Sequence, residues 1–149
     1  MLNAVIIDDE RHCIETLVWK LNEYCSSVKI LGQFQKSIEA IDFIKKTPNI
    51  DILFMDIEMP NINGFEMLKF IDTHNVKIVL TTAYEKYALD ALKMHVYDYL
   101  LKPIDQLELI KLVTNIEHEH DLRKSPVNAK KVISISTQES IEFVLPQEI

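Results

Sequence analysis

Glycine is scarce in this chain of 149 residues, which contains only Gly32 and Gly64. A dinucleotide-binding fingerprint needs three closely spaced glycines and a Walker A loop needs two, so this sequence can form neither motif. A phosphate group would therefore have to be held without a glycine-rich loop. Cysteine is scarce too. Cys13 and Cys25 show neither metal-ligand spacing nor a disulfide framework, and we expect reduced thiols.

Basic residues and long apolar runs are also in short supply. The chain has 16 lysines and arginines against 23 aspartates and glutamates. This balance disfavours nucleic acid as a direct partner, because phosphate backbones are bound by an excess of basic side chains. No apolar run approaches the roughly 18 residues of a membrane span, and the first ten residues lack the basic segment of a signal peptide. We therefore expect a cytoplasmic protein without a membrane partner.

Short apolar runs alternate with helical patterns over the first 124 residues. The expected strands are Ala4–Ile7, Val28–Phe34, Ile52–Met55, Lys77–Leu80 and Tyr97–Leu101. The expected helices are Ile14–Leu21, a segment capped by Ser37, Gly64–Thr73, Tyr87–Met94, and Asp105–Arg123, which opens on a capping box. Strands that are apolar throughout belong to parallel sheets covered on both faces. The sequence thus predicts an α/β fold, a doubly wound five-stranded parallel sheet with five helices.

The pattern changes after residue 124. Residues 125–131 predict a linker, and the apolar runs Lys131–Ile135 and Ile141–Leu145 predict the two strands of a C-terminal β-hairpin. We therefore expect one domain over residues 1–124 and an incomplete second domain over 132–149.

Polar residues follow four of the expected strands. They are Asp8 and Asp9, Asp56, Thr81 and Thr82, and Lys102. Ligands bind at the carboxyl ends of strands in such folds, so these side chains should share one site. Three carboxylates placed together either raise one another's pKa or demand a cation. Oxygen ligands favour Mg²⁺, Ca²⁺ or Mn²⁺, and a few carboxylates with water and phosphate suit octahedral Mg²⁺. A single terminal acid could merely cap the following helix, but its combination with threonine and lysine favours a site.

Four segments carry a resemblance to a known family. IIDDE, FMDIEMPNINGFEML, LTTAYEKYALDAL and DYLLKP resemble, in this order, the receiver domain of two-component response regulators. The resemblance covers about residues 2–123 and implies a flavodoxin-like fold. It also implies a signalling switch that accepts a phosphoryl group from a histidine kinase, rather than a turnover enzyme.

The resemblance assigns roles to individual residues. Asp56 matches the phosphoryl acceptor. Asp9 and Asp56 match direct ligands of Mg²⁺, Asp8 matches a ligand acting through water, and the backbone carbonyl of Glu58 matches a third protein ligand. Lys102 matches the lysine that pairs with the phosphoryl group, in a peptide bond to Pro103 that is usually cis in this family.

Two further positions match the family's switch. Thr82 matches the hydroxyl that binds the phosphoryl group, and Tyr99 matches the aromatic residue that turns inward afterwards. Thr81 is an alternative to Thr82, which we prefer because it directly precedes an alanine, as in the family pattern. Tyr99 could equally be an ordinary half-buried aromatic residue of a strand.

Two neighbours are expected to tune the phosphate lifetime. Glu58 lies two residues after Asp56 and Tyr84 two after Thr82, positions that flank the path of attacking water in receivers. Both could instead be solvent-facing loop residues. The expected readout surface consists of Tyr87–Met94, Tyr97–Leu101 and Asp105–Arg123, through which a phosphorylated homodimer would form.

The tail extends the resemblance. YALDALKMHVYDYLLKPI and KKVISISTQESIEFVLPQEI resemble receivers joined to LytTR-type DNA-binding domains. The chain would then end inside a transcriptional output domain, and DNA would be bound only by that domain. A stand-alone receiver and a binding-only pseudo-receiver are alternatives. A haloacid-dehalogenase-like phosphatase is less favoured, because it would need an aspartate where Glu58 stands and would leave Asp8 and Asp9 unexplained.

Overall fold

The structure is a computed structural model that describes residues 1–124. The predicted linker and hairpin lie outside the described residues. Contacts divide the chain into two compact units, Met1–Leu112 and Val113–Ile149. The boundary falls within the last helix, so the described part of the second unit is the continuation of that helix.

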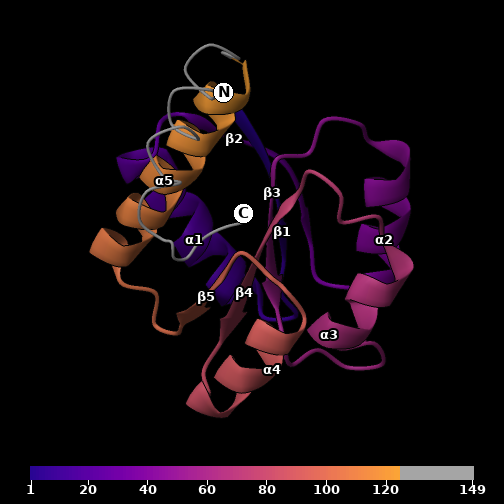
Figure 1. The fold of residues 1–149 in the computed structure, drawn as a ribbon. Helices are drawn as coiled ribbons and strands as arrows, with labels where there is room; N and C mark the ends of the chain where they lie inside the picture. Colours follow the sequence, from indigo (N-terminus) through magenta and orange to yellow (C-terminus); the bar gives the residue numbers. More distant parts are fainter. Residues whose placement is uncertain (125–149) are drawn as a thin grey trace. The chain divides into compact units, whose positions relative to one another are not determined.

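Five parallel strands form a single sheet within the described residues, as the sequence predicts. They are β1 (Leu2–Ile7), β2 (Val28–Phe34), β3 (Ile52–Asp56), β4 (Lys77–Thr82) and β5 (Asp98–Leu101). Their order is β2-β1-β3-β4-β5, so the sheet extends outward from β1 in both directions (Figure 1). The α/β fold of doubly wound, flavodoxin-like type is confirmed.

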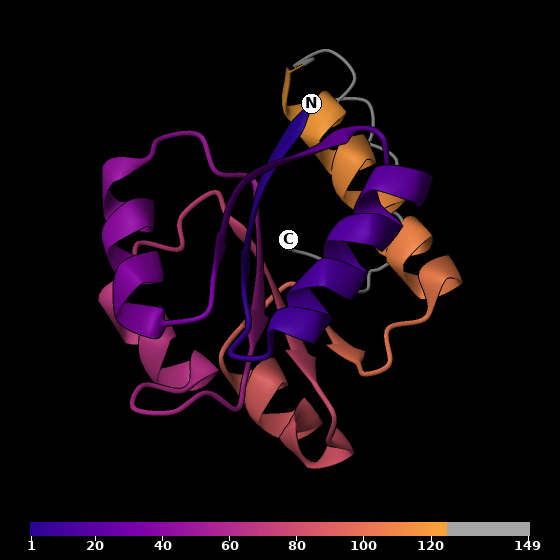
Figure 2. The same cartoon turned by 180° about the vertical axis from the view of Figure 1, so that it is seen from behind.

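Helices follow each strand in turn. They are α1 (Arg11–Tyr24), α2 (Ser37–Lys46), α3 (Gly64–Met67), α4 (Ala88–Lys93) and α5 (Gln106–Lys124), with 3₁₀ turns η1 (Leu68–Phe70) and η2 (Glu85–Tyr87). Figures 1 and 2 show α1 on one side of the sheet and α2 and α3 on the other. Asp105 caps α5, because its carboxylate accepts a hydrogen bond from the Glu108 backbone N at 3.0 Å.

Burial on both faces explains why the strands are apolar throughout. Every residue of β3 is buried. Leu53 and Met55 belong to a cluster with residues of α2, α3 and α4, whereas Ile52 and Phe54 alternate with them and face the opposite side. Alternating residues of a strand point to opposite faces, so a strand covered on both sides needs apolar residues at every position.

Two local predictions are wrong. The helix expected over Gly64–Thr73 is α-helical only as far as Met67 and tightens into η1, because Ile71 adopts extended backbone and packs against the buried cluster. Ser37 does not cap α2. It is the first helical residue, and its buried hydroxyl instead donates a hydrogen bond to the Ile62 carbonyl at 2.7 Å. A buried hydroxyl needs a partner, and here a loop distant in sequence provides it.

Candidate functional site

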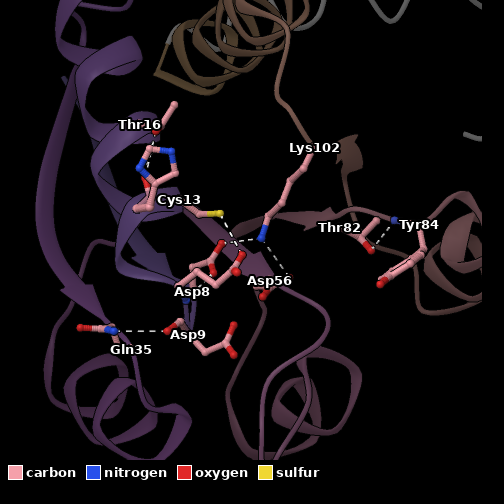
Figure 3. A network of polar contacts seen from close by, with 11 residues as sticks. Asp8, Asp9, Cys13, Thr16, Gln35, Asp56, Thr82, Tyr84 and Lys102 are labelled. Carbon is pink, nitrogen blue, oxygen red and sulfur yellow. Dashed lines mark hydrogen bonds and ion pairs between the residues drawn. The ribbon is translucent and has the colours of Figure 1, made fainter.

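The carboxyl edge of the sheet gathers the three aspartates expected from the sequence. Asp8 directly follows β1, and Asp56 is the last residue of the neighbouring strand β3. Carboxylate oxygens of Asp8, Asp9 and Asp56 all lie within 4.8 Å of one another. Asp8 and Asp56 are 4% exposed. Figure 3 shows the three side chains converging below Lys102.

Lys102 supplies the positive charge of this cluster. Its Nζ lies 2.8 Å from Asp8 Oδ2 and 3.5 Å from Asp56 Oδ1, and its side chain is 17% exposed. The peptide bond between Lys102 and Pro103 is cis, as the sequence resemblance implies. A single ammonium group against three carboxylates leaves the cluster with negative charge to spare.

The electrostatics of the cluster follow from that excess. Burial, together with the charge of Asp8, raises the pKa of Asp56 to about 7, although Lys102 works in the opposite direction. Burial alone would lower the pKa of Lys102, but its hydrogen bond to Asp8 and the charge of Asp56 raise it above the usual value. Without a cation, Asp56 is therefore partly protonated near neutral pH.

The donor set tests which cation would fit. All candidate ligand atoms of Asp8, Asp9 and Asp56 are carboxylate oxygens, which suit a hard divalent cation such as Mg²⁺. The backbone carbonyl of Glu58, expected as a further ligand, belongs to the loop that directly follows β3. A divalent cation would also favour the ionised form of Asp56 that burial opposes.

Gly64 shapes the loop that follows Asp56. Its backbone N donates a hydrogen bond to the Ile57 carbonyl at 2.8 Å, and a Cβ at this position would lie 2.7 Å from the Asp56 carbonyl oxygen. A side chain there would clash with the backbone, so this close approach requires glycine. Gly64 begins α3, where the sequence placed it.

Thr81 and Thr82 end β4 and are both buried. Thr82 Oγ1 accepts a hydrogen bond from the backbone N of Tyr84 at 3.1 Å, which ties its hydroxyl to the segment that follows the strand (Figure 3). Thr81 pairs with Asp56 across the sheet. Tyr99, on β5, is partly buried and packs against the apolar cluster.

Sequence reasoning missed two contacts of the site. The Tyr87 hydroxyl donates a hydrogen bond to Glu58 Oε2 at 2.6 Å, which raises the pKa of Tyr87 to about 12. The Cys13 thiol donates to Glu10 Oε1 at 3.2 Å, and burial, followed by this contact, raises the pKa of Cys13 to about 11. The first pair joins residues 29 positions apart and has no signal in the sequence, whereas Glu10 and Cys13 lie three positions apart at the start of α1.

A mostly apolar cavity of about 380 Å³ opens on the α1 side of this site. Leu17, Phe54 and Ile104 contribute to its walls, and Asp8 and Lys102 lie at its polar end. Asp9 and Asp56 are not among its lining residues. Because Asp8 and Lys102 also belong to the carboxylate cluster, the cavity adjoins the cluster on one side.

Comparison with known proteins assigns the chain to a family. The model of the response regulator receiver domain matches residues 4–114, and the chain belongs to this family. It is 35% identical over 147 residues to the transcriptional regulatory protein BtsR of Escherichia coli K12, an alignment that covers 97% of this chain and 57% of BtsR. The chain spans about half the length of the curated relatives it matches.

Solved receivers share the fold. The response regulatory domain of protein mrkE from Klebsiella pneumoniae is 25% identical with a TM-score of 0.72, covering 79% of this chain and 97% of that one. A CheX-CheY-BeF3-Mg+2 complex from Borrelia burgdorferi is 25% identical with a TM-score of 0.68, covering 77% and 88%. No helix among the described residues is long and apolar enough to cross a membrane.

Proposed function

We propose that this receiver accepts a phosphoryl group from a sensor histidine kinase on Asp56, with Mg²⁺ as cofactor. The observation that carries the proposal is the buried cluster at the carboxyl edge of the sheet. There Asp8, Asp9 and Asp56 lie within 4.8 Å of one another, and Lys102 contacts two of them. The Mg²⁺ of the Borrelia complex supports the choice of cation.

The chemistry uses few groups. An oxygen of the Asp56 carboxylate bonds to phosphorus while the bond from phosphorus to the kinase histidine breaks and that nitrogen keeps the electron pair. Lys102 stands 3.5 Å from Asp56, where its ammonium neutralises charge on the transferring oxygens. Thr82 supplies a hydroxyl donor, since its oxygen is the acceptor in the bond from the Tyr84 backbone N and its own hydrogen can be donated to the phosphoryl group. Mg²⁺, held by Asp8, Asp9, Asp56 and the Glu58 carbonyl, would neutralise the remaining charge.

The phosphorylated state would be read on the surface expected from the sequence, which consists of Tyr87–Met94, Tyr97–Leu101 and Asp105–Arg123. Thr82 moves toward the phosphoryl group and Tyr99 fills the space that it leaves. Leu89 and Leu92 on α4 are 70% and 73% exposed, and we propose them as contacts of a homodimer that forms when Asp56 is phosphorylated. Glu58 and Tyr84 remain our candidates for tuning the lifetime of the phosphate.

For the whole protein we propose a cytoplasmic transcription regulator. The name of BtsR as a transcriptional regulatory protein, and the alignment of 147 residues that extends past residue 124, support an output domain after the receiver. The LytTR-type resemblance of the tail makes that domain the DNA-binding part. A stand-alone receiver is the alternative, and the sequence that follows residue 149 in the gene distinguishes the two.

Phosphorylation of the purified chain tests the proposal. Radiolabelled acetyl phosphate should label the wild type in the presence of Mg²⁺ and not after chelation with EDTA. Asp56→Asn should reduce labelling at least about 100-fold, because an amide is a far poorer nucleophile than a carboxylate. Asp42→Asn is the matched control, since Asp42 lies on the surface of α2 and should label normally.

Two outcomes would contradict the proposal. One is Mg²⁺-dependent labelling that survives Asp56→Asn. The other is sustained turnover of p-nitrophenyl phosphate without a stable phosphoprotein, which would instead indicate a phosphatase.

A further inference from the structure

The contact between Tyr87 and Glu58 joins two loops that leave the sheet side by side. β3 and β4 are hydrogen-bonded neighbours, and Asp56 pairs with Thr81 at their carboxyl ends. The Ile57 backbone N donates to the Thr81 carbonyl at 3.0 Å, after which the two chains diverge. The Tyr87 hydroxyl donates a hydrogen bond to Glu58 Oε2 at 2.6 Å and so links residues 29 positions apart.

The Tyr87 ring is held in place by its surroundings. Its centroid lies 5.9 Å from that of Phe65 and 6.4 Å from that of Tyr84, both in edge-on geometry. Lys86 Nζ lies 5.1 Å from the centroids of Tyr84 and Tyr87. Tyr87 also packs against the apolar cluster. Since the ring is already ordered, little further side-chain entropy is lost when its hydroxyl bonds to Glu58.

The segment that carries Tyr84 and Tyr87 also contacts the Thr82 hydroxyl. The backbone N of Tyr84 donates to Thr82 Oγ1 at 3.1 Å, and the Tyr84 ring contacts Tyr87. A continuous path of contacts therefore runs from Glu58, two residues after Asp56, through Tyr87 and Tyr84 to Thr82. In this arrangement the Thr82 oxygen is engaged by its own loop.

We propose that Tyr87 is a positioning residue, whose hydrogen bond to Glu58 holds the segment after β4 and, through Tyr84, the Thr82 hydroxyl. This bond stabilises the present arrangement of the segment after β4. When Thr82 moves to bind a phosphoryl group at Asp56, the free energy of the Tyr87–Glu58 contact therefore opposes the movement. This inference rests on the proposed function, because it takes Thr82 as the phosphoryl-binding hydroxyl. A contact that stabilises one of two arrangements lowers the affinity of any ligand that binds preferentially to the other arrangement.

The affinity of the chain for a phosphoryl mimic measures how strongly the Tyr87–Glu58 contact disfavours phosphoryl binding. Fluorine NMR would titrate beryllofluoride into the chain at a fixed Mg²⁺ concentration. Tyr87→Phe removes only the hydroxyl and leaves the net charge unchanged. We expect it to tighten beryllofluoride binding about threefold to tenfold, the effect of losing one ordinary, solvent-exposed hydrogen bond. Tyr24→Phe on α1 is the matched control and should leave the affinity unchanged.

A double-mutant cycle shows whether Tyr87 acts through Glu58. In a Glu58→Ala background, Tyr87→Phe should have no further effect on affinity. In a Glu58→Gln background it should tighten binding again, because the amide oxygen can still accept the hydrogen bond. Weaker or unchanged binding by Tyr87→Phe overturns the proposal, as does equal tightening in the Glu58→Ala background.

Hydrogen exchange in metal-free buffer gives a second readout that needs no phosphoryl group. Tyr87→Phe should raise exchange in both residues 57–63 and residues 84–88, and Tyr24→Phe in neither. Unchanged exchange in both segments overturns the proposed contact. If the wild type fails to bind beryllofluoride, the proposed function of Asp56 fails, whereas the exchange data still decide the contact on their own.

Discussion

Two regions of the described domain contrast sharply in how they treat apolar side chains. Strand β3 buries all of its residues, and Leu53 is 1% exposed at its centre. The short helical segments η1 and α4, which lie on either side of β4 in the chain, do the reverse. Large side chains there face solvent, with Leu89 at 70%, Leu92 at 73% and Phe70 at 52% exposure.

The two regions differ in a way that suits two different roles. Buried β3 can position Asp56, and the exposed region after β4 suits recognition of a partner. The strand that carries Asp56 is packed on both faces, and this packing holds the carboxylate cluster in a defined geometry. The region after β4 consists of a 3₁₀ turn and a short helix with few buried residues. Regions with little burial open at low free energy, and such regions supply moving or docking elements. Under the proposed function, the chemistry and its readout would occupy parts of different local stability.

The largest expected effect is on the free energy of unfolding, and it compares the truncation of a buried leucine with that of an exposed one. Leu53→Ala should lower the free energy of unfolding by about 3 kcal/mol, because it removes buried contacts and leaves a cavity. Leu92→Ala should change it by less than about 0.5 kcal/mol, because the side chain already faces water. Urea denaturation measures both. Similar losses from the two variants would contradict the division.

A pH-dependent effect tests the electrostatics of the rigid region. With divalent cations chelated, the folded pKa of Asp56 is about 7, above the ordinary value of about 4 in an unfolded chain. The folded protein then binds the extra proton between these values, so this contribution to stability is lost as pH rises through 7. From pH 5 to pH 8, Asp56→Asn should gain about 2 to 3 kcal/mol of stability relative to the wild type.

Urea denaturation of both proteins in EDTA at the two pH values measures this difference. Added Mg²⁺ should reduce it, because the cation favours the ionised carboxylate. A stability difference that is the same at pH 5 and pH 8 would show that Asp56 is not held in a carboxylate cluster of this kind.

The smallest expected effect on stability concerns the exposed region. Leu89→Lys should change the free energy of unfolding by less than about 0.5 kcal/mol. If α4 forms the homodimer contact, the same substitution should weaken self-association of the beryllofluoride-bound chain about tenfold, since a charge is placed in an apolar contact. Analytical ultracentrifugation measures this. Trp19→Lys on α1, where Trp19 is 56% exposed, should leave association unchanged.

Much of the fold was predictable from local patterns. The five apolar runs become the five described strands because a parallel sheet covered on both faces demands continuous burial. The predictions that failed were local. The helix after Gly64 ends at Met67, and Ile71 has extended backbone and packs against the buried cluster. The Ser37 hydroxyl bonds to a loop rather than capping α2. Both depend on contacts between distant segments, which spacing along the chain does not encode.

The candidate site divides in the same way. The sequence alone determined which residue types end the strands, and therefore that Asp8, Asp9, Asp56 and Lys102 would share one edge, because parallel strands place their carboxyl ends together. Only the tertiary structure decided how strongly burial perturbs Asp56 and that Tyr87 bonds to Glu58. Burial depth and contacts between loops depend on three-dimensional packing. The sequence showed that glycine is scarce, but only the folded chain shows why position 64 needs one, since Gly64 lies close to the Asp56 carbonyl.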